Sequence, residues 1–231
     1  MKDPYVYQGT NVLINKLNIK DGDTLDKAES DFAGLAANRL RKSDFQIDSI
    51  LDGLKIHKYL FSNLYEWAGQ PRTIDIYKGE SILNGKSIDY VFASYITQAL
   101  KDLDKEYQSV DWKKLNSKEK IEKVCYFVSE FWHIHPFREG NTRTTTVFLY
   151  LLMKQIKLKV NIDFIGKHSK YFRNALVLAS IDQYSEYEHL EAILMDSISL
   201  KKTINGEEKY QTIRGYDLDK YEYNYHHIKE D

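Results

Sequence analysis

The sequence predicts a mainly α-helical protein with a single β-hairpin. Apolar residues recur at helical spacing along most of the chain, as in the series Val124, Val128 and Phe131. Residues 147–153 are apolar all round, which is typical of a helix that is buried on every side. Only residues 73–77 alternate apolar and polar side chains with the period of a strand.

Composition indicates one sizeable hydrophobic core and limits the classes of partner. The chain has 231 residues, of which 42% are hydrophobic. Its 33 basic and 34 acidic residues give a formal charge of −1, which argues against nucleic acid as the main partner. The single cysteine, Cys125, excludes a disulfide framework. We find no signal peptide or membrane span, so we expect a soluble cytoplasmic protein, although specialised secretion would leave no such mark.

Two regions are expected. Residues 1–198 would form the folded domain with its N-terminal lead-in, and residues 199–231 an acidic, tyrosine-rich tail with few aliphatic side chains. The tail tyrosines are either targets of self-modification or part of a solvated strap across the domain.

The first third of the chain contains a lead-in and two helices. Residues 3–24 are expected to be extended and rich in turns, and helices to follow at about 25–42 and 47–67. His57 lies on the apolar face of the second helix, beside Leu54 and Phe61, and is more typical of a core histidine than of a ligand.

The hairpin is expected between Arg72 and Leu83. Its first strand would alternate two isoleucines with polar residues, and Lys78-Gly79-Glu80-Ser81 would supply the turn. An exposed strand edge can accept another chain through main-chain hydrogen bonds. The alternative is a hairpin that packs only on its own core.

Besides a buried helix that starts at about Asn141, four more helices are expected in the rest of the domain. An apolar stripe predicts a helix at about 87–107, and a further helix should run from about Ser117 to the residue before Pro136, because a proline disfavours helical backbone in the residue that precedes it. Gly166 marks an expected turn, and the last two helices should cover about 167–180 and 186–198.

A polar stretch at residues 133–146 separates two of the apolar helices and is the candidate site. A buried helix should start at about Asn141, and its N-terminal amides, with Gly140 and Arg143, would form an anion site suited to phosphate. Glu139 would repel phosphate unless a cation lies between them, which indicates Mg²⁺. His135 titrates near neutrality and could accept a proton from a hydroxyl.

The segment His135-Pro136-Phe137-Arg138-Glu139-Gly140-Asn141-Thr142-Arg143 resembles the signature of Fic domains, which reads HPFx(D/E)GNGRxxR. Asp3-Pro4-Tyr5 and Tyr65-Glu66-Trp67-Ala68-Gly69 also resemble that family, so the likeness covers roughly residues 3 to 195. The resemblance implies a Fic-type helical bundle with a β-hairpin flap over the active-site loop. It also implies the transfer of AMP from ATP to a Ser, Thr or Tyr hydroxyl of a target protein.

The resemblance implies a role for each motif residue. His135 would be the general base, and Glu139 would bind Mg²⁺. Gly140 and Asn141 would cradle the α-phosphate of the co-substrate ATP, with the Thr142 hydroxyl available to the phosphates, and Arg143 would grip the outer phosphates. The flap residues that register the target would be Thr73, Ile74, Asp75, Ile76 and Tyr77.

Two positions depart from the family pattern. Thr142 replaces a glycine and is expected to be helical already, because a β-branched residue is a poor occupant of positive φ. Thr146 replaces the second arginine, and a lost charge-assisted hydrogen bond costs roughly 1.5–3 kcal/mol. Arg138 and Arg173 are the candidates for compensation. The alternatives are therefore another nucleotide or phosphate-containing donor, or a module that binds nucleotide with weak catalysis.

The motif and its regulation also admit other interpretations. His133, His135 and Glu139 could instead supply three zinc ligands, although alternate residues at a helix end point in different directions. Segment 203–207 fits only the first part of the (S/T)xxxE(G/N) inhibitory motif of Fic proteins, and Asn205-Gly206 is more typical of a turn. Restraint by a separate small antitoxin is then one option. The sequence leaves homo-oligomerisation open.

Overall fold

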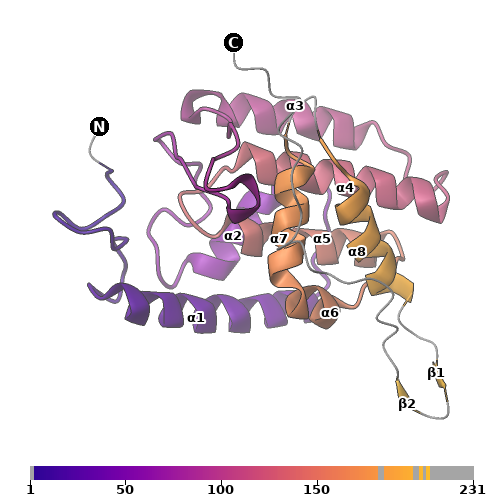
Figure 1. Ribbon diagram of the computed structural model, residues 1–231, viewed down its shortest axis with the longest axis horizontal. Coiled ribbons are helices and arrows are strands. Elements are labelled where there is room, and N and C mark those ends of the chain that lie inside the picture. Colours follow the sequence, from indigo (N-terminus) through magenta and orange to yellow (C-terminus); the bar gives the residue numbers. More distant parts are fainter. Residues whose placement is uncertain (1–2, 182–184, 200–202, 205–206, 209–231) are drawn as a thin grey trace. The chain divides into compact units, whose positions relative to one another are not determined.

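Helices build both of the units into which the chain divides. The computed structural model describes residues 3–181, 185–199, 203–204 and 207–208 (Figure 1). The first unit comprises the chain up to Ile76 together with residues 90–159, and the second comprises residues 77–89 and the chain from Val160 onward. None of the helices in the described residues combines the length and the hydropathy needed to span a membrane.

The first unit is arranged around one central helix. In chain order it contains α1 (Gly22–Lys42), α2 (Asp52–Phe61), the 3₁₀ turn η2 (Ala93–Tyr95), α3 (Ile96–Gln108), α4 (Ser117–Ile134) and α5 (Asn141–Gln155). Helix α5 packs against α1, α2 and α4, and α3 packs against α4. Phe148, Leu149, Leu152 and Met153 of α5 are fully buried, which confirms the prediction from its all-apolar composition.

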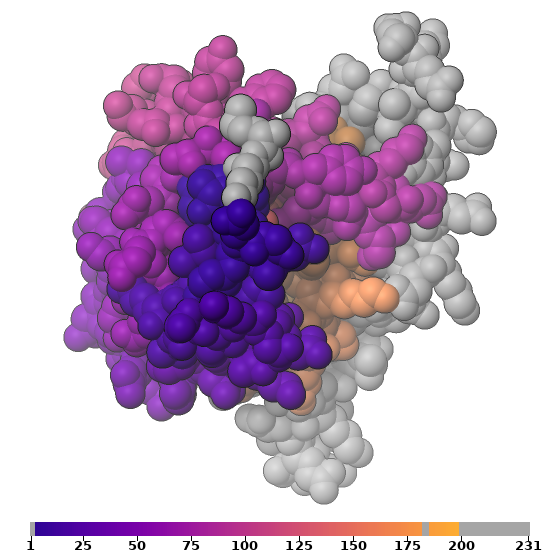
Figure 2. Space-filling view, turned by 90° about the vertical axis from the view of Figure 1, so that its left-hand side faces the viewer, coloured from indigo at the N-terminus to yellow at the C-terminus, as the bar shows by residue number. Residues whose placement is uncertain are grey.

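The N-terminal lead-in is tied to the first unit by hydrogen bonds. An isolated antiparallel bridge joins Val6 to Leu13 within it. The phenol of Tyr5 accepts a hydrogen bond from the Thr73 amide at 3.0 Å, and Lys16 N–H donates to the Leu64 carbonyl at 2.8 Å. In the space-filling view, the indigo of the lead-in and of α1 occupies the centre of the face (Figure 2).

The second unit is smaller. It contains η1 (Ser81–Leu83), α6 (Ile162–Lys167), α7 (Ser169–Leu178), α8 (Glu188–Ser199), β1 (Thr203–Ile204) and β2 (Glu207–Glu208). The three helices pack on one another, and Arg173 of α7 binds the Glu80 carboxylate at 2.7 Å. Strands β1 and β2 pair antiparallel, Thr203 opposite Glu208, so this segment is not the inhibitory helix, as expected.

Local side-chain caps explain where two helices begin. Asp21 accepts a hydrogen bond from the Thr24 amide and starts α1, close to the predicted boundary. Asn116 and Glu119 form a reciprocal capping box that starts α4 at Ser117, as predicted. Two further predictions are confirmed: α4 ends before Pro136, and α5 starts at Asn141.

Other predicted boundaries were wrong. Helix α2 spans only Asp52–Phe61 because side chains bind the amides that precede it: Asp52 accepts from Asp48 and Ser49, and Asp104 accepts from Ile50. The predicted helix at 87–107 starts only at Ile96, after η2, and Gly166 lies inside α6 rather than in a turn. Apart from Ser199, β1 and β2, the predicted tail lies outside the described residues.

The predicted β-hairpin was not found. Residues 72–83 contain no strand, and the 3₁₀ turn η1 occupies Ser81–Leu83. Side chains take backbone groups that a ladder would need, since the guanidinium of Arg72 donates to the Ile74 carbonyl and Asp75 accepts from the Ala93 amide. The turn itself forms later than predicted, between Glu80 and Lys86.

A glycine in α2 offers a test of the packing between α2 and α4. A Cβ atom on Gly53 would lie 2.3 Å from Cζ of the fully buried Phe131, so Gly53→Ala should lower the free energy of unfolding by about 1–3 kcal/mol. The matched control is Gly34→Ala on the exposed face of α1, where nothing lies within 4 Å; we expect a gain of about 0.5–1 kcal/mol there. Urea unfolding measures both. Equal stability of the two variants would contradict this packing.

Candidate active site

The candidate site begins where α4 ends, at His135. This residue is the C-cap of α4, with φ 48° and ψ 58°, and its amide donates to the Trp132 carbonyl at 3.1 Å. Left-handed backbone is uncommon for residues other than glycine, and the following Pro136 prevents the helix from continuing. The histidine is therefore set in one conformation by the end of the helix, and it is almost fully buried.

The ring of His135 is held in a form suited to proton transfer. Its Nδ1 lies 3.0 Å from the Trp132 carbonyl oxygen, which can only accept a hydrogen bond. Nδ1 therefore carries the proton in the neutral ring, and the lone pair is on Nε2, as a general base requires. The Tyr90 ring lies 4.0 Å away, centroid to centroid, and further restricts the imidazole.

Asn141 closes the loop between the two helices. Its side chain accepts a hydrogen bond from the Phe137 amide at 3.0 Å and donates to the Phe137 carbonyl at 2.7 Å. Phe137 and Asn141 are both buried. The side chain of Asn141 thus shapes the loop, and a phosphate would be met at this position by backbone rather than by the amide group.

Gly140 is required by the backbone and by its surroundings. Its φ is +83°, and an added Cβ would lie 2.5 Å from the Phe61 ring. Its amide donates to the Glu139 carboxylate at 3.0 Å, which places that carboxylate at the start of α5. A cation bound to Glu139 would therefore lie near the helix N-terminus, where phosphate oxygens are also favoured.

His57 holds the loop from the other side. Its Nδ1 accepts a hydrogen bond from the Gly69 amide at 2.8 Å, so the proton is on Nε2, which donates to the Glu139 carbonyl at 3.0 Å. The ring stacks on Phe137 with 3.7 Å between centroids. The core histidine predicted from sequence is confirmed, and it also fixes the backbone of the proposed metal ligand.

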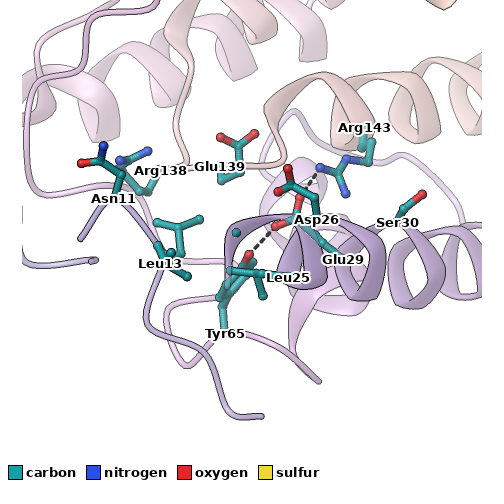
Figure 3. A pocket seen from close by; sticks show the side chains of 12 residues that line it. Asn11, Leu13, Leu25, Asp26, Glu29, Ser30, Tyr65, Arg138, Glu139 and Arg143 are labelled. Carbon is teal, nitrogen blue, oxygen red and sulfur yellow. Dashed lines mark hydrogen bonds and ion pairs between the residues drawn. The ribbon is translucent and has the colours of Figure 1, made fainter. Parts of the chain in front are cut away.

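Glu139 and Arg143 both line a cavity of about 610 Å³ in the first unit (Figure 3). Arg138 of the same loop lines it too, and the other lining residues come from the lead-in, from α1 and from the segment after α2; they include Asp26, Glu29 and Tyr65. Figure 3 shows Glu29 reaching from α1 to Arg143 of α5, with Tyr65 on its other oxygen. Burial, followed by the charge of Glu29, raises the pKa of Tyr65, so this phenol remains a hydrogen-bond donor.

The charges of the cavity indicate that a phosphate would need a cation. Three carboxylates line it, against two guanidinium groups, and both guanidiniums are already paired: Arg138 binds Asp3 at 2.8 Å, and Arg143 binds Glu29. Mg²⁺ commonly binds one or two carboxylates and takes its remaining oxygens from phosphates and water, so Glu139 alone suits it. Among the described residues, no three His, Cys, Asp or Glu side chains could hold a metal together, so His133, His135 and Glu139 do not form the zinc site considered.

The two departures from the family pattern have defined local roles. Thr142 is helical, as predicted, and its hydroxyl accepts a hydrogen bond from the Trp132 indole at 3.0 Å. The Thr146 hydroxyl donates to the Thr142 carbonyl at 2.8 Å. In this structure Arg138 binds Asp3, and Arg173 binds Glu80.

The proposed docking residues fall on both units. Thr73, Ile74, Asp75 and Ile76 belong to the first unit, where the backbone of the preceding Arg72 donates to the Pro136 carbonyl at 2.7 Å. Tyr77 belongs to the second unit, is 73% exposed and donates to the Gly85 carbonyl. The segment that carries the proposed docking residues is thus joined at its start to the candidate catalytic loop.

Sequence reasoning missed several residues that shape the site. Glu29 could have been found, because it is a charged residue on the stripe formed by Leu25 and Ala33, four positions before and after it, and that stripe is buried. The sequence carried no signal that five other residues pair with the motif, namely Asp3, Tyr5, Tyr65, Arg72 and Tyr90. It also carried no signal of the positioning role of His57.

Comparison with known proteins places this site in a family. Residues 49–153 match the family model described as Fic/DOC family. Protein adenylyltransferase VbhT of Bartonella schoenbuchensis is 32% identical over 205 residues, which are 88% of this chain and 40% of VbhT. The probable protein adenylyltransferase y4lH of Sinorhizobium fredii is 36% identical over 157 residues, covering 67% of this chain and 77% of that protein. The chain belongs to the Fic/DOC family.

Solved structures agree on the fold. The BepC protein of Bartonella tribocorum, crystallised with bound AMPPNP, superposes with a TM-score of 0.71 at 24% identity, over 86% of this chain and 97% of that chain. The fold class predicted from sequence, a mainly α Fic-type bundle, is therefore confirmed, whereas its strand-built flap is not.

Burial of His57 makes stability depend on pH. Burial lowers its pKa from 6.5 to about 3, so below pH 6.5 the unfolded chain takes up a proton that the folded chain does not. The contribution of neutral His57 to the free energy of unfolding is present above pH 6.5 and is lost as the pH falls. We expect this loss to lower the free energy of unfolding by about 2 kcal/mol between about pH 7.5 and about pH 5. Urea unfolding of the protein and of His57→Gln, which lacks this group, measures the difference. An identical pH dependence in the two would contradict the assignment.

The contact of Glu29 with Arg143 and Tyr65 can be tested by removing its charge. Glu29→Gln retains the size of the side chain but loses the charge-assisted hydrogen bonds, so we expect the free energy of unfolding to fall by about 1–3 kcal/mol. Asp26→Asn, an exposed carboxylate of the same cavity, should change it by less than about 0.5 kcal/mol. Equal effects in urea unfolding would refute the network.

Proposed function

We propose that the protein is a Mg²⁺-dependent adenylyltransferase that transfers AMP from ATP to a Ser, Thr or Tyr hydroxyl of a target protein. The observation that carries this proposal is the His135 ring, whose Nδ1–H is held on the Trp132 carbonyl beside a loop that ends at Glu139 and the α5 N-terminus. The similar VbhT and y4lH carry the names protein adenylyltransferase and probable protein adenylyltransferase, which supports the same reaction.

The reaction needs one proton transfer and one exchange of bonds. His135 Nε2 would accept the proton of the target hydroxyl, whose oxygen forms a bond to the α-phosphorus. The bond from that phosphorus to the bridging oxygen breaks, and pyrophosphate leaves with its electron pair. The protein's main contribution is to position the groups and to neutralise charge.

The phosphates would be held at the start of α5. Backbone amides of the helix N-terminus offer hydrogen bonds, and Arg143 has further N–H groups besides the one on Glu29. Glu139 would hold Mg²⁺, which would supply positive charge beside the phosphates and offset the negative charge of the cavity. Thr73, Ile74, Asp75, Ile76 and Tyr77 would align the target segment through their main chain.

A second candidate keeps the fold but changes the donor. Because Thr146 offers no positive charge, the terminal phosphate of ATP would be bound less firmly. Another nucleotide or phosphate-containing donor is then the alternative, as is a nucleotide-binding module with weak turnover. A separate small antitoxin would be the inhibitory partner. The protein would act in the cytoplasm, and its first 198 residues would form the functional domain.

The reaction and its donor can be tested together. ATP, GTP, CTP and UTP labelled at the α-phosphate are incubated with Mg²⁺, the protein and a cell lysate, and label in protein is measured. We expect label from ATP, and a loss of at least about 100-fold in His135→Ala, since general-base catalysis typically supplies that much.

The matched control is His133→Ala, which removes the neighbouring histidine from the last turn of α4 and should retain labelling within about threefold, as expected for a site outside the reacting groups. Label from another nucleotide would shift the assignment to that donor. No label from any of the four would refute the proposed transfer for these donors.

A further inference from the structure

The guanidinium group of Arg72 is buried among backbone carbonyls. The residue is 2% exposed, and Nε donates to the His135 carbonyl at 2.9 Å. Nη1 donates to the Ile74 carbonyl at 2.7 Å, and Nη2 donates to the carbonyl of Val91. The carboxylate of Asp75, itself 64% exposed, is 3.8 Å away. The positive charge is thus met mainly by three main-chain dipoles.

The three carbonyls belong to three different parts of the first unit. Ile74 lies two residues before the chain leaves this unit after Ile76, and Val91 is the second residue after it returns at Tyr90. His135 is the candidate general base. Residues 77–89 lie outside the first unit, and the Arg72 guanidinium binds the chain on both sides of them, at Ile74 and Val91. The same group also binds the candidate catalytic loop at His135.

A second contact follows the same route. Tyr90, the neighbour of Val91, places its ring 4.0 Å from the His135 ring, and its edge against Trp132 at 5.8 Å. Arg72 also donates its backbone amide to the Pro136 carbonyl at 2.7 Å. A displacement of the returning chain would thus act on the His135 ring and backbone together.

We propose that Arg72 is a positioning residue, which couples the target-docking flap to the orientation of His135. The inference rests on the proposed function, because it assigns a purpose to the flap. His135 has a left-handed backbone that persists only when its surroundings fix it, and Arg72 binds its carbonyl while Trp132 binds its amide. A target segment that fixes residues 73–77 would then also fix the base.

The geometry explains why this position carries arginine. A planar guanidinium offers five N–H groups in a fixed fork and can donate to three carbonyls that lie in different directions. Lysine carries the same charge at the end of a flexible stem, and its ammonium group could not span the same three oxygens. Arg72→Lys therefore removes the coupling while it keeps the charge.

The first experiment compares Arg72→Lys with Arg39→Lys, an exposed arginine of α1. Transfer kinetics give kcat and KM for the target, and equilibrium binding gives the dissociation constant of ATP with Mg²⁺. For Arg72→Lys we expect kcat to fall about 100-fold, since small misplacement of a catalytic group has effects of this size, with ATP binding changed less than about twofold. Arg39→Lys should match the parent protein.

A second measurement does not depend on activity. Nitrogen NMR of the histidine rings reports the tautomer of His135, which should be Nδ1-protonated in the parent protein and a mixture of tautomers in Arg72→Lys. Hydrogen exchange should quicken at amides 73–76 and 91–93 and remain unchanged in α3. Thermal unfolding shows that the variant is folded.

The outcomes separate the inference from the proposed function. Unchanged kcat and an unchanged His135 tautomer in Arg72→Lys would overturn the inference and leave the transferase assignment intact. A variant in which ATP binding and thermal stability fall together with kcat would also overturn the inference, because this result would show a merely structural role for Arg72. A parent protein without transfer would refute the proposed function, and the NMR result would then decide the coupling by itself.

Discussion

The left-handed turn at His135 is the constraint on which the rest of the site depends. Its amide and its ring Nδ1 both meet the Trp132 carbonyl, and its own carbonyl meets Arg72. The helix end therefore holds the amide and the ring of the base, and Arg72 holds its carbonyl. Because Pro136 follows, α4 cannot continue, and the chain must enter the loop that carries Glu139 to α5.

The other half of the loop is fixed by buried polar groups, one at the start of α5 and the others from distant elements. Asn141 clasps Phe137, His57 binds the Glu139 carbonyl, and Glu29 with Tyr65 binds Arg143. Each of these groups is satisfied inside the protein, so the loop can be rigid without a ligand. A nearly rigid site with paired charges is suited to reactions in which positioning and charge neutralisation supply most of the rate.

Much of the fold could be predicted from local patterns in the sequence. The wrong predictions share one cause. The boundaries around the motif were predicted correctly because Asn116, Pro136 and Gly140 act on their own neighbours. Helix α2 and the flap were predicted wrongly because side chains from elsewhere bind their backbone: Asp104 takes the Ile50 amide, and Arg72 takes carbonyls at Ile74 and Val91. A period in the sequence does not reveal such competition.

By itself, the sequence determined the residue types of the site and the helix, loop and helix that carry them, because capping, proline and glycine effects act over a few residues. Only the tertiary structure decided the partners of those residues. Arg138 meets Asp3 and Arg143 meets Glu29 across more than a hundred residues of chain, and His57 reaches Glu139 across 82 residues. Such pairs form when packing brings buried charges and polar groups together and each must find a partner, which no local pattern specifies.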